Sequence, residues 1–274
     1  MLLVIGKPIQ HSLSPKIHNF WLKKYNINQV YEKRELEEKD LKDIIEKIKQ
    51  KRLTGVNVTI PYKTKIFDFV DEASLRAKKS NAINTLYFKD NQVIGENTDG
   101  LGFVNSLEEE GNLNIENKNI FLIGSGGAAK GIIAEMLKRK INSLTIANRT
   151  LERAIELKEL FSENKTPINI QDWQCLQPDK KTDVIVNTTS VGMKRNQLID
   201  IDSSDLKQDV ILYDIIYNPA ETELIKKFKK KGFKTINGLG MLIQQASMAF
   251  SLWFDINLSN EDLIQVRVLC EKSD

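Results

Sequence analysis

The sequence predicts an α/β fold made of two α/β domains, with a C-terminal helix that returns toward the first domain. Three observations support this prediction. The chain has 274 residues, and because domains of roughly 150 residues are common, about two are expected. Short β-rich runs alternate with helical patterns along the chain, as they do in α/β sheets. An apolar strand, a glycine-rich loop and a helix follow one another around Gly124, which is typical of a Rossmann-like domain.

Residues 1–100 are expected to form the first domain. Its predicted strands are Met1–Ile5, Gln29–Lys33, Gly55–Ile60, Ile83–Phe88 and Gln92–Gly95, of which the last two form a hairpin or paired strands. Ser14 is a candidate helix N-cap, because Pro15 then occupies the first helical position. Apolar residues at helical spacing mark this helix (Ile17, Phe20, Trp21, Tyr25) and a second one (Leu41, Ile44, Ile45, Ile48). Pro61 is expected to start a third helix.

Residues 101–238 are expected to form the second domain, and residues 239–274 to form helices that pack back on the first. A connecting helix is predicted at Leu101–Glu110, because Gly111 would end it. The uniformly apolar run Asn119–Ile123 indicates a buried parallel strand. Further strands are predicted at Ser143–Ala147, Asp183–Val186, Val210–Tyr213 and Lys234–Ile236, and helices around Ile132–Leu137 and at Leu151–Phe161, Glu221–Lys231 and 238–254.

Composition excludes several classes of protein. The chain carries 40 Lys and Arg against 37 Asp and Glu, a net charge of +3 without a block of like charge, so nucleic acid is not expected as a partner. No run approaches the ~18 apolar residues of a membrane span, and the N-terminus lacks the pattern of a signal peptide. Two cysteines, Cys175 and Cys270, are too few for a disulfide framework or a zinc cluster. A cytoplasmic protein without a metal is therefore expected.

The glycine-rich loop matches the pattern G-x-G-x-x-A between a strand and a helix. Gly124 would permit the tight turn, Gly126 would let the backbone approach a pyrophosphate, and Ala129 would let the helix lie close to the strand. The exposed N–H groups and the helix dipole would favour phosphate. A tight turn without a ligand is the alternative, and the strand before and helix after the loop disfavour it.

The residues after the next strand indicate which dinucleotide would bind. This strand ends in Ala147-Asn148-Arg149-Thr150, without the acidic residue that would bind the ribose 2′-hydroxyl of NAD. Arg149 instead offers a planar guanidinium suited to a 2′-phosphate, and Arg153 follows one helical turn later. Two solvated arginines are the alternative, although cations at a helix N-terminus are electrostatically unfavourable there. NADP is therefore the expected cofactor.

Several segments, in this order, resemble the bacterial shikimate dehydrogenases along essentially the whole chain. They are Gly6-Lys7-Pro8-Ile9 with His11-Ser12-Leu13-Ser14-Pro15, 56–63 (VNVTIPYK), 82–85 (AINT), 97–100 (NTDG), the glycine loop, 148–150 (NRT), 187–189 (NTT), and 238–242 (GLGML) with Gln245. The resemblance implies reversible, NADP-dependent reduction of 3-dehydroshikimate to shikimate in aromatic amino acid biosynthesis. It also implies that residues 1–100 bind the substrate and residues 101–238 bind NADP.

The resemblance places functional roles on particular residues. The implied substrate-binding residues are Ser12, Ser14, Thr59, Lys63, Asn84, Asp99, Tyr217 and Gln245, with Lys63 and Asp99 as the catalytic pair. The implied or expected cofactor-binding residues are Gly124, Ser125, Gly126, Gly127, Ala128, Asn148, Arg149, Thr150, Arg153, Ile215 and Gly238. The chain departs from the family pattern at Asn81, Ile83 and Ser125, and around Leu75, where an acidic residue is usual. None of these departures falls on a residue assigned to the chemistry.

The chemistry of ketone reduction fits the implied pair, because a proton must reach the developing alkoxide. Lys63 is expected just inside the helix that starts at Pro61, and Asp99 in a loop between the domains. A nearby carboxylate favours the ammonium form of a lysine, so Lys63 would donate the proton. The alternative for Lys63 is a solvated surface charge. For Ser14 the alternative is a role as helix cap only, and for Gln245 it is a hydrogen bond to a backbone carbonyl.

Three alternative functions are compatible with parts of the sequence. A quinate/shikimate dehydrogenase of broader specificity, often NAD-using, is the nearest alternative, and Arg149 and Arg153 argue against NAD. A glutamyl-tRNA reductase would need a nucleophilic cysteine early in the chain, where none occurs. A non-catalytic NADP-binding protein would be expected to lack Lys63 or Asp99. His11 and His18 are expected to be structural, and the chain is expected to be a monomer or homodimer.

Overall fold

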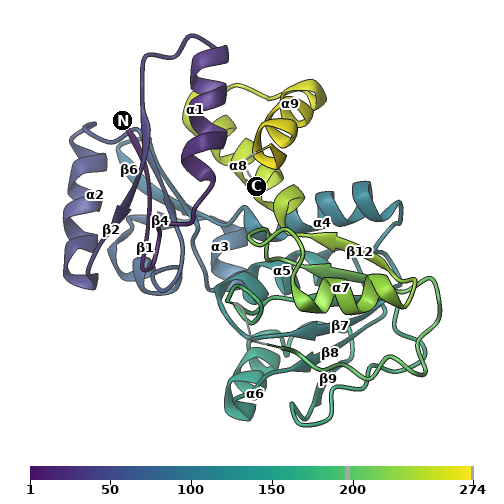
Figure 1. Ribbon diagram of the computed structural model, residues 1–274. Coiled ribbons are helices and arrows are strands. Elements are labelled where there is room, and N and C mark those ends of the chain that lie inside the picture. Colours follow the sequence, from purple (N-terminus) through teal and green to yellow (C-terminus); the bar gives the residue numbers. More distant parts are fainter. Residues whose placement is uncertain (195–197, 273–274) are drawn as a thin grey trace. The chain divides into compact units, whose positions relative to one another are not determined.

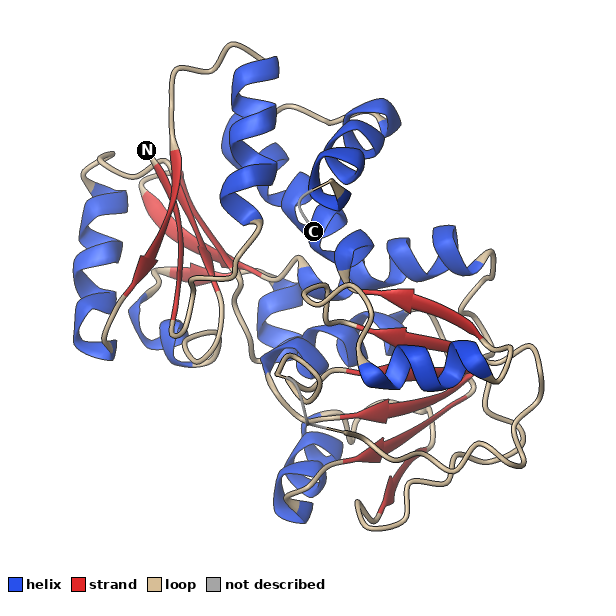
Figure 2. Ribbon diagram, in the orientation of Figure 1, coloured by secondary structure: helices blue, strands red, loops and turns tan. Residues whose placement is uncertain are grey.

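The computed structural model describes residues 1–194 and 198–272, and it divides into two compact units (Figure 1). The first unit comprises Met1–Gly102 and Leu242–Asp274, and the second comprises Phe103–Met241. Strands and helices alternate through both units (Figure 2), which confirms the α/β prediction. Which unit binds which ligand stays a prediction.

The first unit is built on a mixed six-stranded sheet. Its strands are β1 (Leu2–Gly6), β2 (Tyr31–Glu35), β3 (Gly55–Val58), β4 (Glu72–Ala73), β5 (Thr85–Lys89) and β6 (Gln92–Glu96). The order across the sheet is β2-β1-β3-β5-β6-β4. Strand β1 pairs in parallel with both β2 and β3, so the carboxyl ends of β1 and β3 lie side by side. The predicted hairpin is present, because β5 and β6 pair antiparallel.

Helices cover both faces of this sheet. On one face, α2 (Leu41–Lys49) buries its apolar stripe against alternate residues of β1 and β3. On the other face lie α1 (Ser14–Lys24) and α8 (Leu239–Phe254) from Leu242 onward, and α9 (Asn260–Glu271) packs on α1 (Figure 1). The indole of Trp253 on α8 donates to the carbonyl of Leu86 on β5 at 3.0 Å, and the indole of Trp21 on α1 donates to the carbonyl of Asp262 on α9 at 3.3 Å. These bonds attach the C-terminal helices to the first unit.

Two local predictions in the first unit are wrong. Ser14 is not the N-cap, because α1 begins at Ser14 itself and the hydroxyl of Ser12 accepts the Ser14 N–H at 3.3 Å. Pro61 starts no α-helix: Lys63 lies in a turn, followed only by the short 3₁₀-helix η2 (Lys65–Phe69). The segment after Lys65 is rich in aromatic and β-branched residues, which disfavour an α-helix.

Some short elements lay outside the prediction, and others begin elsewhere. The structure adds η1 (Glu38–Asp40), β4, α3 (Leu75–Ser80) and, in the second unit, β9 (Ile168–Gln171). Strand β2 begins at Tyr31, two residues after the predicted Gln29. Elements this short carry too little periodicity to be recognised in a sequence.

The second unit is a doubly wound parallel sheet. Its strands are β7 (Asn119–Ile123), β8 (Ser143–Ala147), β9, β10 (Val184–Asn187), β11 (Ile211–Asp214) and β12 (Lys234–Asn237). Their order is β12-β11-β10-β7-β8-β9, the order of dinucleotide-binding folds. One face packs on α4 (Asp99–Gly111), α5 (Gly127–Lys138) and α6 (Leu151–Leu160), and the other on α7 (Glu223–Lys230). The strand order reverses between β7 and β10, where such folds bind their ligands.

Helix α4 starts earlier than predicted. It includes Asp99, whose backbone N–H is accepted by the side-chain oxygen of Asn97 at 3.0 Å. Asp99 therefore lies in the first turn of a helix and not in a loop. The helix dipole favours a carboxylate in that first turn.

Membrane-spanning segments were also sought among the described helices. None of them combines the length and the apolar composition that crossing a bilayer requires.

Candidate active site

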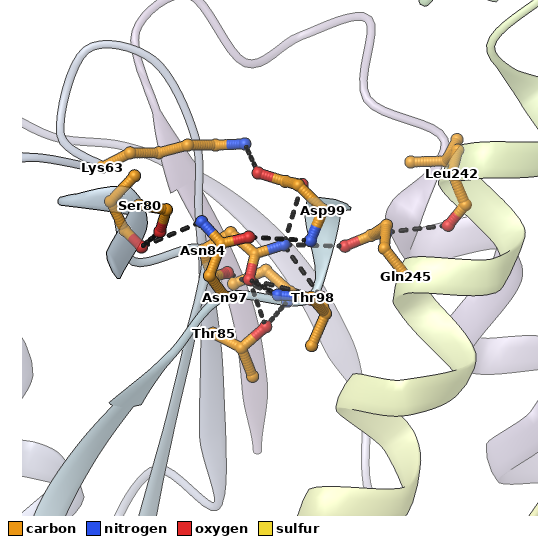
Figure 3. A network of polar contacts seen from close by, with 11 residues as sticks. Lys63, Ser80, Asn84, Thr85, Asn97, Thr98, Asp99, Leu242 and Gln245 are labelled. Carbon is orange, nitrogen blue, oxygen red and sulfur yellow. Dashed lines mark hydrogen bonds and ion pairs between the residues drawn. The ribbon is translucent and has the colours of Figure 1, made fainter. Parts of the chain in front are cut away.

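Lys63 and Asp99 form an ion pair in the first unit. The Lys63 Nζ lies 2.5 Å from the Asp99 Oδ2, and the two side chains are only 12% and 6% exposed. Figure 3 shows the ammonium pointing at the carboxylate. The pair predicted from the sequence is therefore present, and a solvated surface charge is the wrong interpretation of Lys63. A lysine held this way presents an N–H close to a carboxylate that stabilises its charge.

The backbone around Lys63 is fixed by its neighbours. The N–H of Tyr62 donates to the carbonyl of Thr59 at 2.9 Å, which closes the turn after β3. The buried Tyr62 hydroxyl donates to the carbonyl of Leu36 at 2.5 Å. The carbonyl of Lys63 accepts the N–H of Ile83 at 2.7 Å. The lysine therefore extends from a turn that is anchored on both sides.

Asn84 joins the ion pair to the other buried polar side chains (Figure 3). Its Nδ2 donates to Asp99 Oδ1 at 2.9 Å and to Thr98 Oγ1 at 2.9 Å, and lies 3.3 Å from Gln245 Oε1. The Nε2 of Gln245 donates to the carbonyl of Leu242 at 2.8 Å. Gln245 therefore does bond to a backbone carbonyl, which was the alternative for this residue, and its Oε1 also faces Asn84. Four of the predicted residues, Lys63, Asn84, Asp99 and Gln245, form one connected group.

Ser12, Ser14 and Thr59 lie outside that hydrogen-bonded group. In residues 1–194 and 198–272, their side chains form no hydrogen bond with its four members. Ser12 and Ser14 follow β1, and Thr59 follows β3, so the three belong to the shared carboxyl edge of two adjacent parallel strands. The loops touch there: a Cβ placed on Gly6 would lie 2.4 Å from the Thr59 Cγ2. Neutral hydroxyls thus gather at the same edge of the sheet as Lys63.

The glycine loop of the second unit has the predicted form. Gly124 has a φ of +112°, and a Cβ there would lie 2.5 Å from the Thr188 hydroxyl, so a side chain is excluded. Thr188 follows β10, which places this contact at the point where the strand order reverses. Gly126 is exposed with open space around it, and α5 begins at Gly127. The backbone at Gly126 is therefore accessible to a phosphate, as is Ser125 beside it. Ala128 is half-buried in the first turn.

The residues after β8 are suited to an anion. Arg149 and Arg153 are exposed, and neither takes part in an ion pair within the described ranges. The Asn148 side chain donates to the carbonyl of Thr150 at 2.7 Å, which shapes the turn. Thr150 is the N-cap of α6, yet its hydroxyl does not cap the helix. Within the described residues, the two guanidinium groups have no ion-pair partner and the Thr150 hydroxyl makes no capping hydrogen bond. All three groups lie where a 2′-phosphate is expected to bind.

Two residues implied to lie near the nicotinamide are in contact. A Cβ on Gly238 would lie 1.9 Å from the carbonyl oxygen of Ile215, so only glycine allows the β12–α8 turn to approach the end of β11. Ile215 and Tyr217 are both half-buried, and Tyr217 follows Ile215 by two residues on the same loop. The close approach explains why a glycine occurs at position 238.

Asp214 is a buried carboxyl group that sequence reasoning missed. Its Oδ1 accepts the Asn187 side-chain N–H at 2.9 Å and the Ile216 backbone N–H at 3.2 Å. Its Oδ2 accepts the Thr222 hydroxyl at 2.7 Å. Burial raises the pKa of Asp214 to about 6, although these hydrogen bonds favour the charged form. An acid at the end of an otherwise apolar strand is the signal that could have identified it.

Replacing Asp214 by asparagine is expected to change how stability depends on pH. Because the folded protein raises the pKa of Asp214 from 3.8 to about 6, its stabilising effect is complete below the unfolded value and is lost as the pH rises to about 6. This difference corresponds to about 3 kcal/mol at most. Urea unfolding at several pH values should show wild type losing stability relative to Asp214→Asn across that window. Asp205→Asn controls for loss of an exposed carboxyl, and a constant difference between wild type and Asp214→Asn would contradict the expectation.

Comparisons with known proteins agree with this geometry. Residues 4–86 match the family model "Shikimate dehydrogenase substrate binding domain", and residues 106–239 match "Shikimate / quinate 5-dehydrogenase". The chain is 43% identical over 254 residues to a shikimate dehydrogenase (NADP(+)) of Pelagibacter ubique, with 93% of each chain covered.

Two solved structures have the same fold. A shikimate dehydrogenase in complex with NADP+ superimposes with a TM-score of 0.89 at 36% identity, covering 98% of this chain and 94% of its own. A shikimate 5-dehydrogenase of Listeria monocytogenes in complex with shikimate and NAD gives a TM-score of 0.88 at 29% identity, covering 98% and 96%. With both its parts matched and nearly its full length aligned to such relatives, the chain belongs to the shikimate dehydrogenase family.

Proposed function

We propose that this protein catalyses the reversible, NADP-dependent reduction of 3-dehydroshikimate to shikimate, within aromatic amino acid biosynthesis. The observation that carries the proposal is the nearly buried Lys63–Asp99 pair, which offers a charged proton donor among neutral hydrogen-bonding side chains. A reduction of a polyhydroxylated keto acid needs both of these features.

In the direction of reduction, the Lys63 ammonium donates its proton to the ketone oxygen as negative charge develops there. In the direction of oxidation, Lys63 must first lose a proton so that its amine can accept the one from the shikimate hydroxyl. Asp99 accepts a hydrogen bond from the ammonium and holds the Nζ in place. Oxidation is therefore favoured at a higher pH than reduction.

The substrate is held by residues at the carboxyl edge of the first sheet. Ser12 and Ser14 are suited to the carboxylate, because they are hydroxyl donors at the start of α1, where the helix dipole favours negative charge. Thr59, Asn84 and Gln245 provide neutral donors and acceptors for the ring hydroxyls. Tyr217 is assigned to the substrate by family resemblance.

The second unit has the features that NADP requires. Backbone N–H groups of the loop from Gly124 to Ala128 would bind the pyrophosphate, and Arg149, Thr150 and Arg153 would bind the 2′-phosphate. Ile215 and Gly238 would lie near the nicotinamide. When bound, the reduced cofactor supplies the hydride that the ketone carbon receives.

Turnover measurements test the proposed function directly. The expected result is oxidation of shikimate with NADP, at a kcat/KM well above that with quinate or with NAD. Comparable efficiencies for shikimate and quinate would favour the broader quinate/shikimate dehydrogenase, which the family model also covers. Binding of NADP without turnover of either substrate would favour the non-catalytic alternative.

Arg149→Ala is expected to reduce the preference for NADP. Loss of one charge-assisted hydrogen bond to the 2′-phosphate costs about 1.5–3 kcal/mol, roughly tenfold to a hundredfold in kcat/KM. The value with NAD should change little, because NAD has no phosphate at that position. Lys158→Ala removes an exposed cation in the last turn of α6 and is the matched control. If wild type used NAD and NADP equally well, the assignment of Arg149 to the 2′-phosphate would be wrong.

We further propose that the protein acts in the cytoplasm as a monomer or homodimer, without nucleic acid, membrane or metal as a partner. Support comes from the balanced charge and from the two cysteines, of which Cys175 is exposed, Cys270 is buried, and both are free.

A further inference from the structure

Buried hydrogen bonds connect the middle of the first sheet to the active site. The hydroxyl of Tyr31 on β2 donates to Asn57 Oδ1 on β3 at 2.7 Å. Because this oxygen accepts, the other end of the Asn57 amide must donate, and its Nδ2 lies 3.0 Å from the hydroxyl oxygen of Thr85 on β5. Asn57 and Thr85 are paired across the antiparallel β3–β5 ladder. All three side chains are buried.

Thr85 passes this orientation on to Asn84. A threonine hydroxyl has a single proton, and since the oxygen accepts from Asn57, the proton is free to donate to Asn84 Oδ1, 3.1 Å away. The backbone N–H of Thr98 donates to the same oxygen at 2.8 Å. Asn84 therefore has its oxygen toward β5 and its Nδ2 toward Asp99 Oδ1.

The result is that both carboxylate oxygens of Asp99 accept from fixed donors. Oδ1 accepts from Asn84 and Oδ2 from Lys63. Thr85 is fully buried, and it touches neither member of the ion pair through any hydrogen bond in the described residues. The hydrogen bonds that connect Thr85 to the ion pair run through Asn84.

We propose that Thr85 is a positioning residue for the reaction: its hydroxyl fixes the Asn84 amide, which in turn fixes the Asp99 carboxylate that holds Lys63. The proposal rests on the proposed function, because its readout is shikimate turnover. Without the hydroxyl, the Asn84 oxygen keeps its donors from Thr98 and loses the one from β5, so the amide and the Asp99 carboxylate beyond it are held less firmly. Small errors in the position of a catalytic group lower rates strongly.

The test compares Thr85→Val with Thr85→Ser. Valine keeps the shape of threonine and removes the hydroxyl, whereas serine keeps the hydroxyl and removes the methyl group. The expected kcat for shikimate oxidation falls about tenfold in Thr85→Val and stays within about twofold of wild type in Thr85→Ser. A purely structural residue would show no such rescue, because serine loses buried packing that valine retains.

A second arm measures Thr85→Val in an Asp99→Asn background. If Thr85 acts through the Asp99 carboxylate, the tenfold factor disappears there, which is the signature of coupled residues. Thr54→Val is the matched control, because it removes one side-chain hydrogen bond of the same unit, from Thr54 Oγ1 to Gln29 Oε1 at 2.8 Å. It should lower the thermal midpoint without lowering kcat.

Three results would overturn the proposal: Thr85→Val with near-normal kcat, Thr85→Ser as impaired as Thr85→Val, or an undiminished factor in Asp99→Asn. Should Thr85→Val fail to fold, Tyr31→Phe replaces it, because it removes the donor that orients Asn57. An unchanged kcat in that variant would equally overturn the proposal. Wild-type turnover is measured first, so absence of shikimate oxidation by wild type would refute the proposed function and not the role of Thr85.

Discussion

Replacing Lys63 by methionine is expected to lower kcat for shikimate oxidation about a hundredfold to ten-thousandfold, the usual contribution of general acid–base catalysis. Methionine keeps most of the apolar stem and removes the proton and the charge. The Lys63 Nζ lies 2.5 Å from Asp99 Oδ2 in a nearly buried site, so the substitution removes the charged donor of that site. We expect KM for shikimate to change only a few-fold, because the proton transfer is made in the transition state.

Lys65→Met is the matched control for this experiment. Lys65 lies two residues further on, its side chain is 45% exposed, and it pairs with Glu38 at the surface. It should keep its kcat, since a surface ion pair contributes little. A Lys63→Met enzyme with near-normal kcat and a greatly raised KM would make Lys63 a binding residue. The proton would then have to come from Asp99, Tyr217 or water.

Asp99→Asn should lower kcat as well, but it should also weaken shikimate binding. Asp99 both holds Lys63 and accepts the Asn84 amide, so its loss disturbs two groups at once. The effects of Lys63→Met and Asp99→Asn should not add, because the two residues act as one unit. Kinetics of the double variant measure this, and full additivity would mean that the residues act separately.

The candidate catalytic and cofactor residues could be proposed from the sequence because the segments that carry them follow the ends of strands. Lys63 comes shortly after β3, and Arg149 directly after β8. Parallel strands present functional side chains at their carboxyl ends, which supports both assignments, while the role of Lys63 also depends on the family resemblance. The tight turn predicted at Gly124 agrees with the positive φ of this residue.

Residues that act through cross-strand contacts could not be predicted. Thr85 meets Asn57 only because β3 and β5 pair antiparallel in one particular register, and register depends on the whole sheet. Asp214 meets Asn187 for the same reason, across β10 and β11. The proline signal also misled at Pro61, because the aromatic and β-branched residues after Lys65 disfavour the α-helix that a proline at the first position suggests.

His18 is expected to make the folded protein sensitive to acid. Its ring is fully buried among aromatic side chains and stacks on Tyr31 with ring centroids 4.3 Å apart. Burial lowers the pKa of His18 from 6.5 to about 3, and the nearby Asn57 side chain opposes this to a smaller extent. The neutral ring is therefore part of the core, as expected of a structural histidine.

The folded protein loses stability in acid because it binds a proton at His18 only at a lower pH than the unfolded chain does. In the unfolded chain His18 binds a proton below about pH 6.5, while in the folded protein it does so only near pH 3. The stability that the neutral ring contributes is therefore present above pH 6.5 and is lost progressively as the pH falls. Each pH unit corresponds to about 1.4 kcal/mol, so roughly 3 kcal/mol should be lost by pH 4.5. That is a large fraction of the 5–15 kcal/mol by which domains are typically stable.

Urea unfolding of wild type and His18→Phe between pH 8 and pH 4.5 measures this effect. Phenylalanine keeps an aromatic ring beside Tyr31 but cannot take up a proton, so the difference in unfolding free energy between the two proteins isolates the contribution of His18. We expect this difference to be constant above pH 7 and to fall by about 1.4 kcal/mol per unit below pH 6. His11→Gln, which removes the exposed second histidine, is the control for loss of a histidine at the surface. Parallel curves for wild type and His18→Phe down to pH 4.5 would mean that His18 takes up its proton without unfolding the core, and that the aromatic cluster tolerates a charge.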